Sequence, residues 1–279
     1  RMPARVGAIH AENALFVITG ASRGIGREIA LQCASKAHES SAYLITARSE
    51  GKLVEVKNEI KERNPNAKVW IVICDMGDLN EEAKRTFDTV MREITERKSY
   101  SSLFLFHNAG FLGDVSKKAI KLNDVDNWNE FLMANFVNMV LFNNIILKWI
   151  THLMCPNRYI INMSSILAVQ AFVSFTQHAC GKAAREAFFR GLAVEEPSLR
   201  VLNYCPGPVL TDMYRIVQEK SYDSTIRNAY TVDENGDAKA ESDVHTKQLT
   251  PEQTVSKLLR ILNEDRYKSG DRIDYFDDE

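Results

Sequence analysis

The sequence lacks the features that mark several other classes of protein. It has no C-x-x-C pair, and its cysteines are scattered without His/Cys ligand spacing, at Cys33, Cys74, Cys155, Cys180 and Cys205. It has no excess charge of either sign, because 35 Lys and Arg stand against 37 Asp and Glu. We therefore expect no disulfide framework, no metal site and no nucleic-acid partner.

Long apolar runs are also missing. No stretch offers about 18 uninterrupted apolar residues, the length of a membrane span, and residues 1 to 13 mix Arg, His, Glu and Asn. The expectation is therefore a cytoplasmic protein with no membrane partner. With 279 residues, 45% of them hydrophobic, the chain can bury one large core, so we expect a single domain over 1–279.

Short apolar runs alternate along the chain with longer segments of helical spacing. This alternation predicts an α/β fold: a Rossmann-type, doubly wound parallel sheet of about seven strands with helices on both faces. The expected strands lie near 14–19, 42–47, 68–74, 103–107, 158–163, 200–205 and 272–276. The expected helices lie near 25–37, 50–63, 80–97, 126–150, 176–195 and 251–263.

The segment 218–248 breaks this alternation. It is polar, contains Asn235-Gly236 and has no apolar periodicity. We expect a long loop there, or a lid on the substrate side, rather than a helix or strand.

A glycine-rich turn follows the first strand. Gly20 allows a sharp turn, Gly24 lets backbone N–H groups approach a diphosphate, and Gly26 lets the next helix pack close to the sheet. Because the turn joins a strand to a helix, it predicts a dinucleotide site.

The end of the second strand indicates which dinucleotide. An NAD-binding protein normally presents Asp or Glu there, but this chain has Arg48. Arg48, assisted by Arg23, can pair with a 2′-phosphate, so we predict NADPH; a solvated cation is the alternative for Arg48. Asp75 follows the third strand and could bind the adenine, or simply form a turn.

Four further motifs follow in order: Asn108-Ala109-Gly110 after a strand, Asn135 in a long helix, Ser164-Ser165 after another strand, and Lys182 in GKAARE. Together with the T-G-x-x-x-G-x-G of the glycine turn, they resemble the short-chain dehydrogenase/reductase family. The phrases EEPSLRVLNYCPGP and KSGDRIDYF resemble its members that reduce pterin side-chain carbonyls, and the likeness covers about residues 14 to 276.

This resemblance implies roles for the second group of motifs. Ser165 would polarise a substrate carbonyl, Lys182 would hold the cofactor ribose, and Asn135 would hold a water linked to Lys182. A tyrosine normally stands four residues before the lysine as the proton donor, but this chain has His178 there.

His178 is therefore the unexpected residue of the set. An imidazole has an ordinary pKa of about 6.5 against about 10 for a phenol, and a charged Lys182 would lower it further. We expect a mostly neutral His178 at pH 7 and weakened catalysis, with a water or no donor as alternatives.

The resemblance also implies substrate and partner contacts. Gly207 and Thr211 would help to hold the cofactor, and Asp274 would bind the pterin ring unless it belongs to a solvated acidic tail. The helices 126–150 and 176–195 would form a homodimer interface, or else be buried within one subunit.

The expected function is thus an NADPH-dependent reduction of pterin carbonyls. A nearly inactive NADPH- and pterin-binding protein, or a reductase of other ketones and dicarbonyls, is the alternative. The expected cofactor-binding residues are Gly20, Ser22, Arg23, Gly24, Ile25, Gly26, Arg48, Asp75, Asn108, Ala109, Gly110, Lys182, Gly207 and Thr211.

Overall fold

A computed structural model describes residues 9, 13–96, 99–150, 155–231 and 248–277. Seven parallel strands form one sheet in the order β3-β2-β1-β4-β5-β6-β7. The strands are β1 (Ala14–Thr19), β2 (Ala42–Ala47), β3 (Lys68–Ile73), β4 (Ser102–His107), β5 (Asn157–Met163), β6 (Leu199–Cys205) and β7 (Arg272–Asp274). The predicted fold class is therefore confirmed. The predicted limits of β1 and β2 match the structure, and those of the other strands differ by one or two residues.

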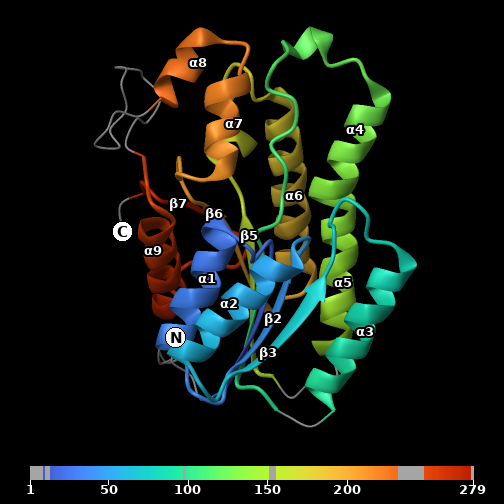
Figure 1. The fold of residues 1–279 in the computed structure, drawn as a ribbon, viewed down its shortest axis with the longest axis vertical. Helices are drawn as coiled ribbons and strands as arrows, with labels where there is room; N and C mark the ends of the chain where they lie inside the picture. Colours follow the sequence, from blue (N-terminus) through green and yellow to red (C-terminus); the bar gives the residue numbers. More distant parts are fainter. Residues whose placement is uncertain (1–8, 10–12, 97–98, 151–154, 232–247, 278–279) are drawn as a thin grey trace.

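Helices cover both faces of the sheet, as Figure 1 shows. The helices α1 (Gly24–Lys36), α2 (Glu50–Arg63) and α9 (Pro251–Glu264) pack on one face through residues such as Ile29, Leu53 and Leu258. On the other face, α3 (Glu81–Thr95), α5 (Asn138–Ile150) and α6 (Thr176–Glu195) bury Phe87, Phe142 and Phe189. The central strands are apolar along their length because both of their faces are buried.

The predicted helix 126–150 is interrupted in the structure. It consists of α4 (Val125–Leu132), a π-helical turn (Met133–Val137) and α5. The combined stretch Val125–Ile150 is long and apolar enough to cross a membrane by length and composition alone. Its α5 residues Met139, Phe142 and Ile146 are buried in the core, as expected for a core helix of an α/β domain.

The prediction that 218–248 contains no helix is wrong in its first part. The helix α7 (Asp212–Lys220) reaches into this segment, and α8 (Ser224–Ala229) lies within it. The Asp223 side chain caps α8 by accepting from the N–H groups of Thr225 and Ile226, and the helix buries Ile226. The rest of the segment, 232–247, lies outside the described residues.

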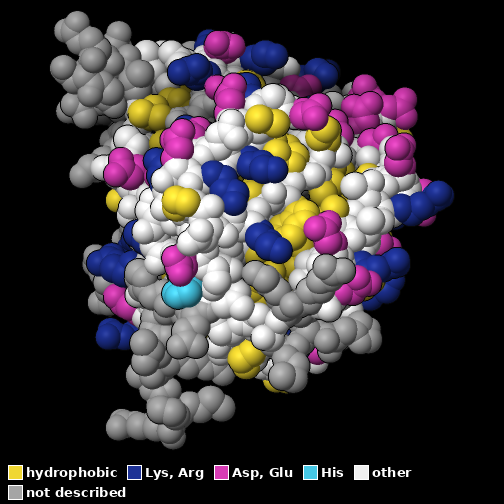
Figure 2. Space-filling model, turned by 60° about the horizontal axis from the view of Figure 1, so that its bottom comes forward, with side chains coloured by type: hydrophobic (Ala, Val, Ile, Leu, Met, Phe, Trp, Pro, Cys, Tyr) yellow, Lys and Arg dark blue, Asp and Glu magenta, His cyan; other side chains and the backbone are white. Residues whose placement is uncertain are grey.

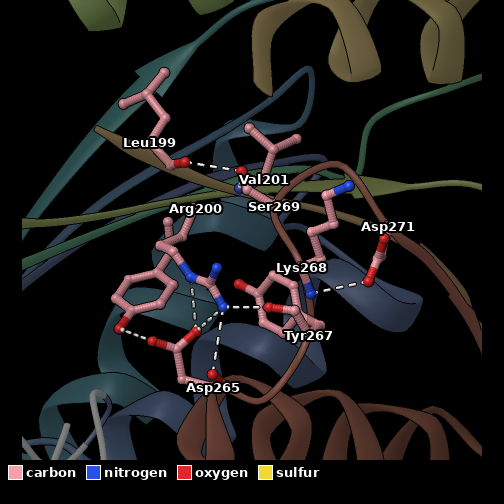
Figure 3. Close-up of polar contacts among 9 residues, drawn as sticks. Leu199, Arg200, Val201, Asp265, Tyr267, Lys268, Ser269 and Asp271 are labelled. Carbon is pink, nitrogen blue, oxygen red and sulfur yellow. Dashed lines mark hydrogen bonds and ion pairs between the residues drawn. The ribbon is translucent and has the colours of Figure 1, made fainter. Parts of the chain in front are cut away.

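A polar network at the start of β6 fixes the last strand (Figure 3). Arg200 donates through Nε to Asp265 Oδ1 at 2.8 Å and stacks on the Tyr267 ring at 4.5 Å. Ser269 donates to Leu199 O at 2.8 Å and accepts from the N–H of Val201 at 3.0 Å. Together with backbone hydrogen bonds such as that from Gly270 N–H to Val201 O at 2.8 Å, these contacts lead the chain into β7 beside β6.

Candidate active site

A cleft of about 720 Å³ opens at the carboxyl ends of the strands. This is the position at which doubly wound sheets bind ligands. The structure brings most of the predicted site residues to its wall: Gly20, Ser22, Arg23, Gly24, Ile25, Arg48, Asp75, Asn108, Ala109, Gly110, Ser165, His178, Lys182, Gly207 and Thr211. Three of the predicted residues, Gly26, Asn135 and Asp274, do not line it.

The glycine turn has the geometry of a diphosphate cradle. Gly20 has φ of +66°, a left-handed conformation that favours glycine, and a Cβ at Gly26 would lie 2.3 Å from Gly20 O. Asn108 ties β4 to this turn, because its Nδ2 donates to Thr19 O at 3.0 Å. The helix α1 begins at Gly24 with its amino end at the cleft, so the turn fits an anionic group.

The two arginines expected at the 2′-phosphate have different surroundings. Arg23 forms an ion pair with Asp212 at the start of α7, which offsets its charge. Arg48 lies over the Phe111 ring at 5.3 Å, with its Nη1 3.7 Å from Asp75 Oδ2. Each arginine thus has a carboxylate partner, and Arg48 has the longer ion pair of the two together with the support of the Phe111 ring.

Asp75 also closes a turn after β3. Its Oδ1 accepts from the N–H of Gly77 at 2.8 Å, and its carboxylate is half exposed. Both interpretations of Asp75 are therefore compatible with the structure, since the residue forms a turn and lines the cleft.

Ser165, His178 and Lys182 come from two neighbouring elements. Ser165 follows β5, and its Oγ accepts from the N–H of Leu167 at 3.2 Å, which leaves the hydroxyl proton available. His178 and Lys182 lie four residues apart on α6, so they share one face of that helix. The Lys182 Nζ donates to Met163 O at 2.6 Å, which anchors the lysine at the end of β5.

Burial controls the charge of both α6 residues. Burial, followed by the charge of Lys182, lowers the pKa of His178 to about 3, while the backbone of Phe111 and Leu112 opposes the change. His178 is only 6% exposed, and its Nδ1 has no hydrogen-bond partner among the residues that the structure describes. Burial and the nearby Arg185 charge lower the pKa of Lys182 to about 7. The imidazole is thus neutral at pH 7, in the direction that the sequence suggests.

Asn135 joins the π-helical turn to the loop after Gly110. Its side chain is 3% exposed, accepts from the N–H of Phe111 at 2.8 Å and donates to Phe131 O at 3.0 Å. Each amide atom can make one further hydrogen bond, so the expected water linked to Lys182 stays a prediction.

Asp274 is placed beside the cleft rather than in its wall. It pairs with Cys205 in the register of β6 and β7, and its Oδ1 accepts from the N–H of Phe276 at 3.0 Å. The carboxylate thus closes a turn at the end of β7, and the pterin contact of Asp274 stays a prediction.

Two buried charged residues of α6 are missing from the sequence prediction. Arg185 and Glu186 are each 1% exposed, and Glu186 accepts a short hydrogen bond from Ser164. The signal was present in the sequence, since Arg185 follows Lys182 by three residues and therefore shares its face of the helix.

Part of the cleft wall is apolar and aromatic. It is formed by Leu112, Leu167, Phe175, Met213, Tyr214 and Tyr230. A flat ring system fits such a wall through stacking and edge contacts.

The family model described as short chain dehydrogenase matches residues 14–221. Sepiapterin reductase from Rattus norvegicus is 33% identical over 265 residues, which cover 95% of this chain and 97% of that protein. Sepiapterin reductase from Xenopus tropicalis is 32% identical, over 94% of this chain and 96% of that protein. In fold, the chain is similar to L-sorbose reductase from Gluconobacter frateurii in complex with NADPH and L-sorbose. That similarity has a TM-score of 0.75, 20% identity and 96% coverage of each chain.

Proposed function

The chain belongs to the short-chain dehydrogenase/reductase family, and we propose that it uses NADPH to reduce the side-chain carbonyl of sepiapterin or a related pterin. The observation that carries the proposal is the joint placement of Ser165, His178 and Lys182 in the cleft that also contains the glycine turn. We place the reaction in tetrahydrobiopterin biosynthesis, which accords with the relatives named sepiapterin reductase.

NADPH fits the cleft by its chemistry. The backbone N–H groups at the amino end of α1 and at the Gly20 turn would bind the diphosphate. Arg48 would pair with the 2′-phosphate, and Lys182 would donate to the ribose hydroxyls. Bound NADPH would supply the hydride that reduces the carbonyl carbon.

The protein must stabilise and protonate the carbonyl oxygen as negative charge grows on it. The Ser165 hydroxyl donates a hydrogen bond to this oxygen. Neutral His178 donates through an imidazole N–H and releases that proton to the alkoxide, so that the product is an alcohol. Lys182, with its pKa of about 7, is the nearby acid that can restore the proton, and it is charged below that pH.

Turnover tests the proposal directly. The rate of NADPH oxidation would be measured with sepiapterin and, separately, with a small aliphatic diketone. We expect turnover of sepiapterin that falls by about a hundredfold or more in Ser165→Ala, within the range for loss of an oxyanion donor. Equal rates for the starting protein and Ser165→Ala would contradict the proposed site, and faster turnover of the diketone would favour the other-carbonyl alternative.

A second candidate function rests on His178 alone. Replacement of the usual tyrosine removes the family's normal proton donor, so the chain could bind NADPH and pterin without turning them over. Binding energy survives the loss of a proton donor, whereas transition-state stabilisation does not. Tight binding of both ligands without NADPH oxidation would support this second function.

We also propose that the protein is a cytoplasmic homodimer. A groove of about 640 Å³ lies between α5 and α6, lined by residues such as Leu147, Phe188 and Leu192. On the face drawn in Figure 2, Lys and Arg side chains lie beside a strip of hydrophobic groups, with Asp and Glu side chains around them. Light scattering of the purified chain would test the dimer, and a mass of one subunit would exclude it.

A further inference from the structure

Arg185 is a charged residue in the interior of the protein. It is 1% exposed, and its guanidinium donates to oxygen atoms only. Its Nε donates to Asn162 Oδ1 at 2.8 Å, and its Nη2 donates to His107 O at 2.5 Å. Its Nη1 donates to Ala109 O at 2.9 Å and to Asn135 O at 3.5 Å. The guanidinium is therefore well supplied with acceptors.

These acceptors belong to separate parts of the active site. His107 ends β4, Ala109 lies in the loop that lines the cleft, Asn135 lies in the π-helical turn, and Asn162 is in β5. Three of the four acceptors are backbone carbonyls, which need donors when they are buried. Arg185 thus ties α6, the helix that carries His178 and Lys182, to the loop and the turn in front of them.

The choice of arginine has a geometric reason. A guanidinium presents five N–H donors in a planar fork, whereas an ammonium group is a compact charge with three donors. A lysine at this position could not reach acceptors on both sides of the fork. The contacts therefore depend on the shape of the side chain as well as on its charge.

The positive charge of Arg185 has no carboxylate partner among the ion pairs of the described residues. The neighbouring Glu186 accepts from Ser164 through Oε1 and from Arg190 Nη1 at 3.2 Å through Oε2. After burial, the charge of Arg185 is a further cause that lowers the pKa of both Lys182 and His178, the two active-site residues on the same helix. For Lys182, Glu186 and the buried Cys205 act in the opposite direction.

We propose that Arg185 is a positioning residue for the reduction: its guanidinium holds the loop 108–111 and the π-helical turn at Asn135 in register with His178 and Lys182 on α6. The inference rests on the proposed function for its turnover assay. It goes beyond that function because Arg185 lies behind the cleft wall and is absent from its lining.

Two substitutions at Arg185 distinguish the effect of the planar guanidinium from the effect of its charge. Arg185→Lys keeps a positive charge but loses the planar fork, and Arg185→Met loses both. We expect each to lower kcat by about tenfold to a hundredfold, the usual cost of misplaced catalytic groups. Arg190→Met is the matched control, because Arg190 lies on the same helix with its side chain 55% exposed, and its kcat should stay within about twofold of the starting value.

The pH dependence of NADPH affinity gives a second measurement, because a purely structural role of Arg185 would leave its midpoint unchanged. If the Lys182 ammonium holds the ribose, affinity falls as the pH rises through about 7. In Arg185→Met this fall should shift upward by about one unit, because a like charge has been removed. In Arg185→Lys and Arg190→Met the midpoint should stay where it is in the starting protein.

A third substitution tests the same charge effect in a protein that keeps Arg185, in case the Arg185 variants do not fold. Asn162→Asp places a carboxylate at the Nε contact, which measures 2.8 Å, and offsets the charge without removing the arginine. It should also raise the midpoint of NADPH affinity. Folded Arg185 variants with an unchanged kcat, or an unchanged midpoint in both Arg185→Met and Asn162→Asp, would overturn the inference. Absence of turnover in the starting protein would instead overturn the proposed function and leave the affinity test in force.

Discussion

Acidification from pH 7 to pH 5 should destabilise the folded protein through two buried imidazoles. Burial is the main cause that lowers the pKa of His107 and of His178, each to about 3. In the unfolded chain each returns to about 6.5. Between these values the unfolded chain binds more protons than the folded chain, so the free energy of unfolding falls as the pH falls.

The size of the effect follows from the unfolded-state value. Each pH unit below 6.5 costs about 1.4 kcal/mol per imidazole, so the loss from pH 7 to pH 5 is about 2 kcal/mol for each and about 4 kcal/mol for the pair. The result holds for any folded-state pKa well below 5. The surroundings of both rings favour the neutral form, since the Nδ1 atoms of His107 and His178 are buried and have no hydrogen-bond partner within the described part of the chain.

Urea denaturation at the two pH values would measure this loss. Titrating carboxylates contribute equally to the starting protein and to single His→Gln variants, so the difference between them isolates one imidazole. We expect His178→Gln and His107→Gln each to lose about 2 kcal/mol less than the starting protein. An equal loss in His178→Gln and the starting protein would refute a buried, neutral His178.

Three further predictions concern the site. Arg48→Asp should reverse the preference for NADPH over NADH by at least about tenfold, through loss of the phosphate partner; equal affinities for the two cofactors in the starting protein would contradict the role of Arg48. Asp274→Asn should raise the pterin KM by about tenfold if the Asp274 carboxylate leaves its turn to bind the ring, and an unchanged KM would confine Asp274 to the turn. His178→Tyr should raise kcat by about tenfold to a thousandfold, the range for a positioned general acid. Equal turnover in His178→Phe and the starting protein would show that His178 donates no proton.

The expected cause of the pH profile is Lys182 rather than His178. An imidazolium acid at position 178 with the ordinary pKa of about 6.5 would lose its proton as the pH approaches 7, and activity would fall with it. With a pKa of about 3, His178 has no proton to lose there beyond its neutral N–H, whereas Lys182 titrates at about 7. The fall through pH 7 remains the expectation for kcat/KM, but its cause is Lys182.

The sheet was predictable because its strands are buried on both faces. Strands such as β1 and β4 are apolar along their length, and the glycine turn and the residues after β4 and β5 mark where ligand-facing ends begin. Most of the cleft could therefore be placed by connecting strand ends in a doubly wound order.

The helices were harder to predict where local spacing does not decide the structure. The six-residue helix α8 is too short for an apolar period to show. It depends on the Asp223 cap and on burial of Ile226 in a cluster with residues distant in sequence, such as Val115. The π-helical turn inside 126–150 leaves the apolar pattern of the sequence nearly unbroken, so only the structure reveals it. Pairs such as Arg23 with Asp212, which lie 189 residues apart, are equally invisible to local spacing.

The protonation states of the site residues could not be predicted from the sequence. His178 and Lys182 are four residues apart, and their spacing alone suggests one neutral ring beside one charged ammonium group. Burial of Arg185 behind them changes this picture, because the guanidinium keeps its proton while both neighbours are driven toward their neutral forms. The arginine is the natural holder of the buried charge, since even with burial its pKa remains at about 10. The acid–base properties of the site therefore arise first from burial and then from competition among three basic side chains on one helix, in which the group of highest intrinsic basicity retains the proton.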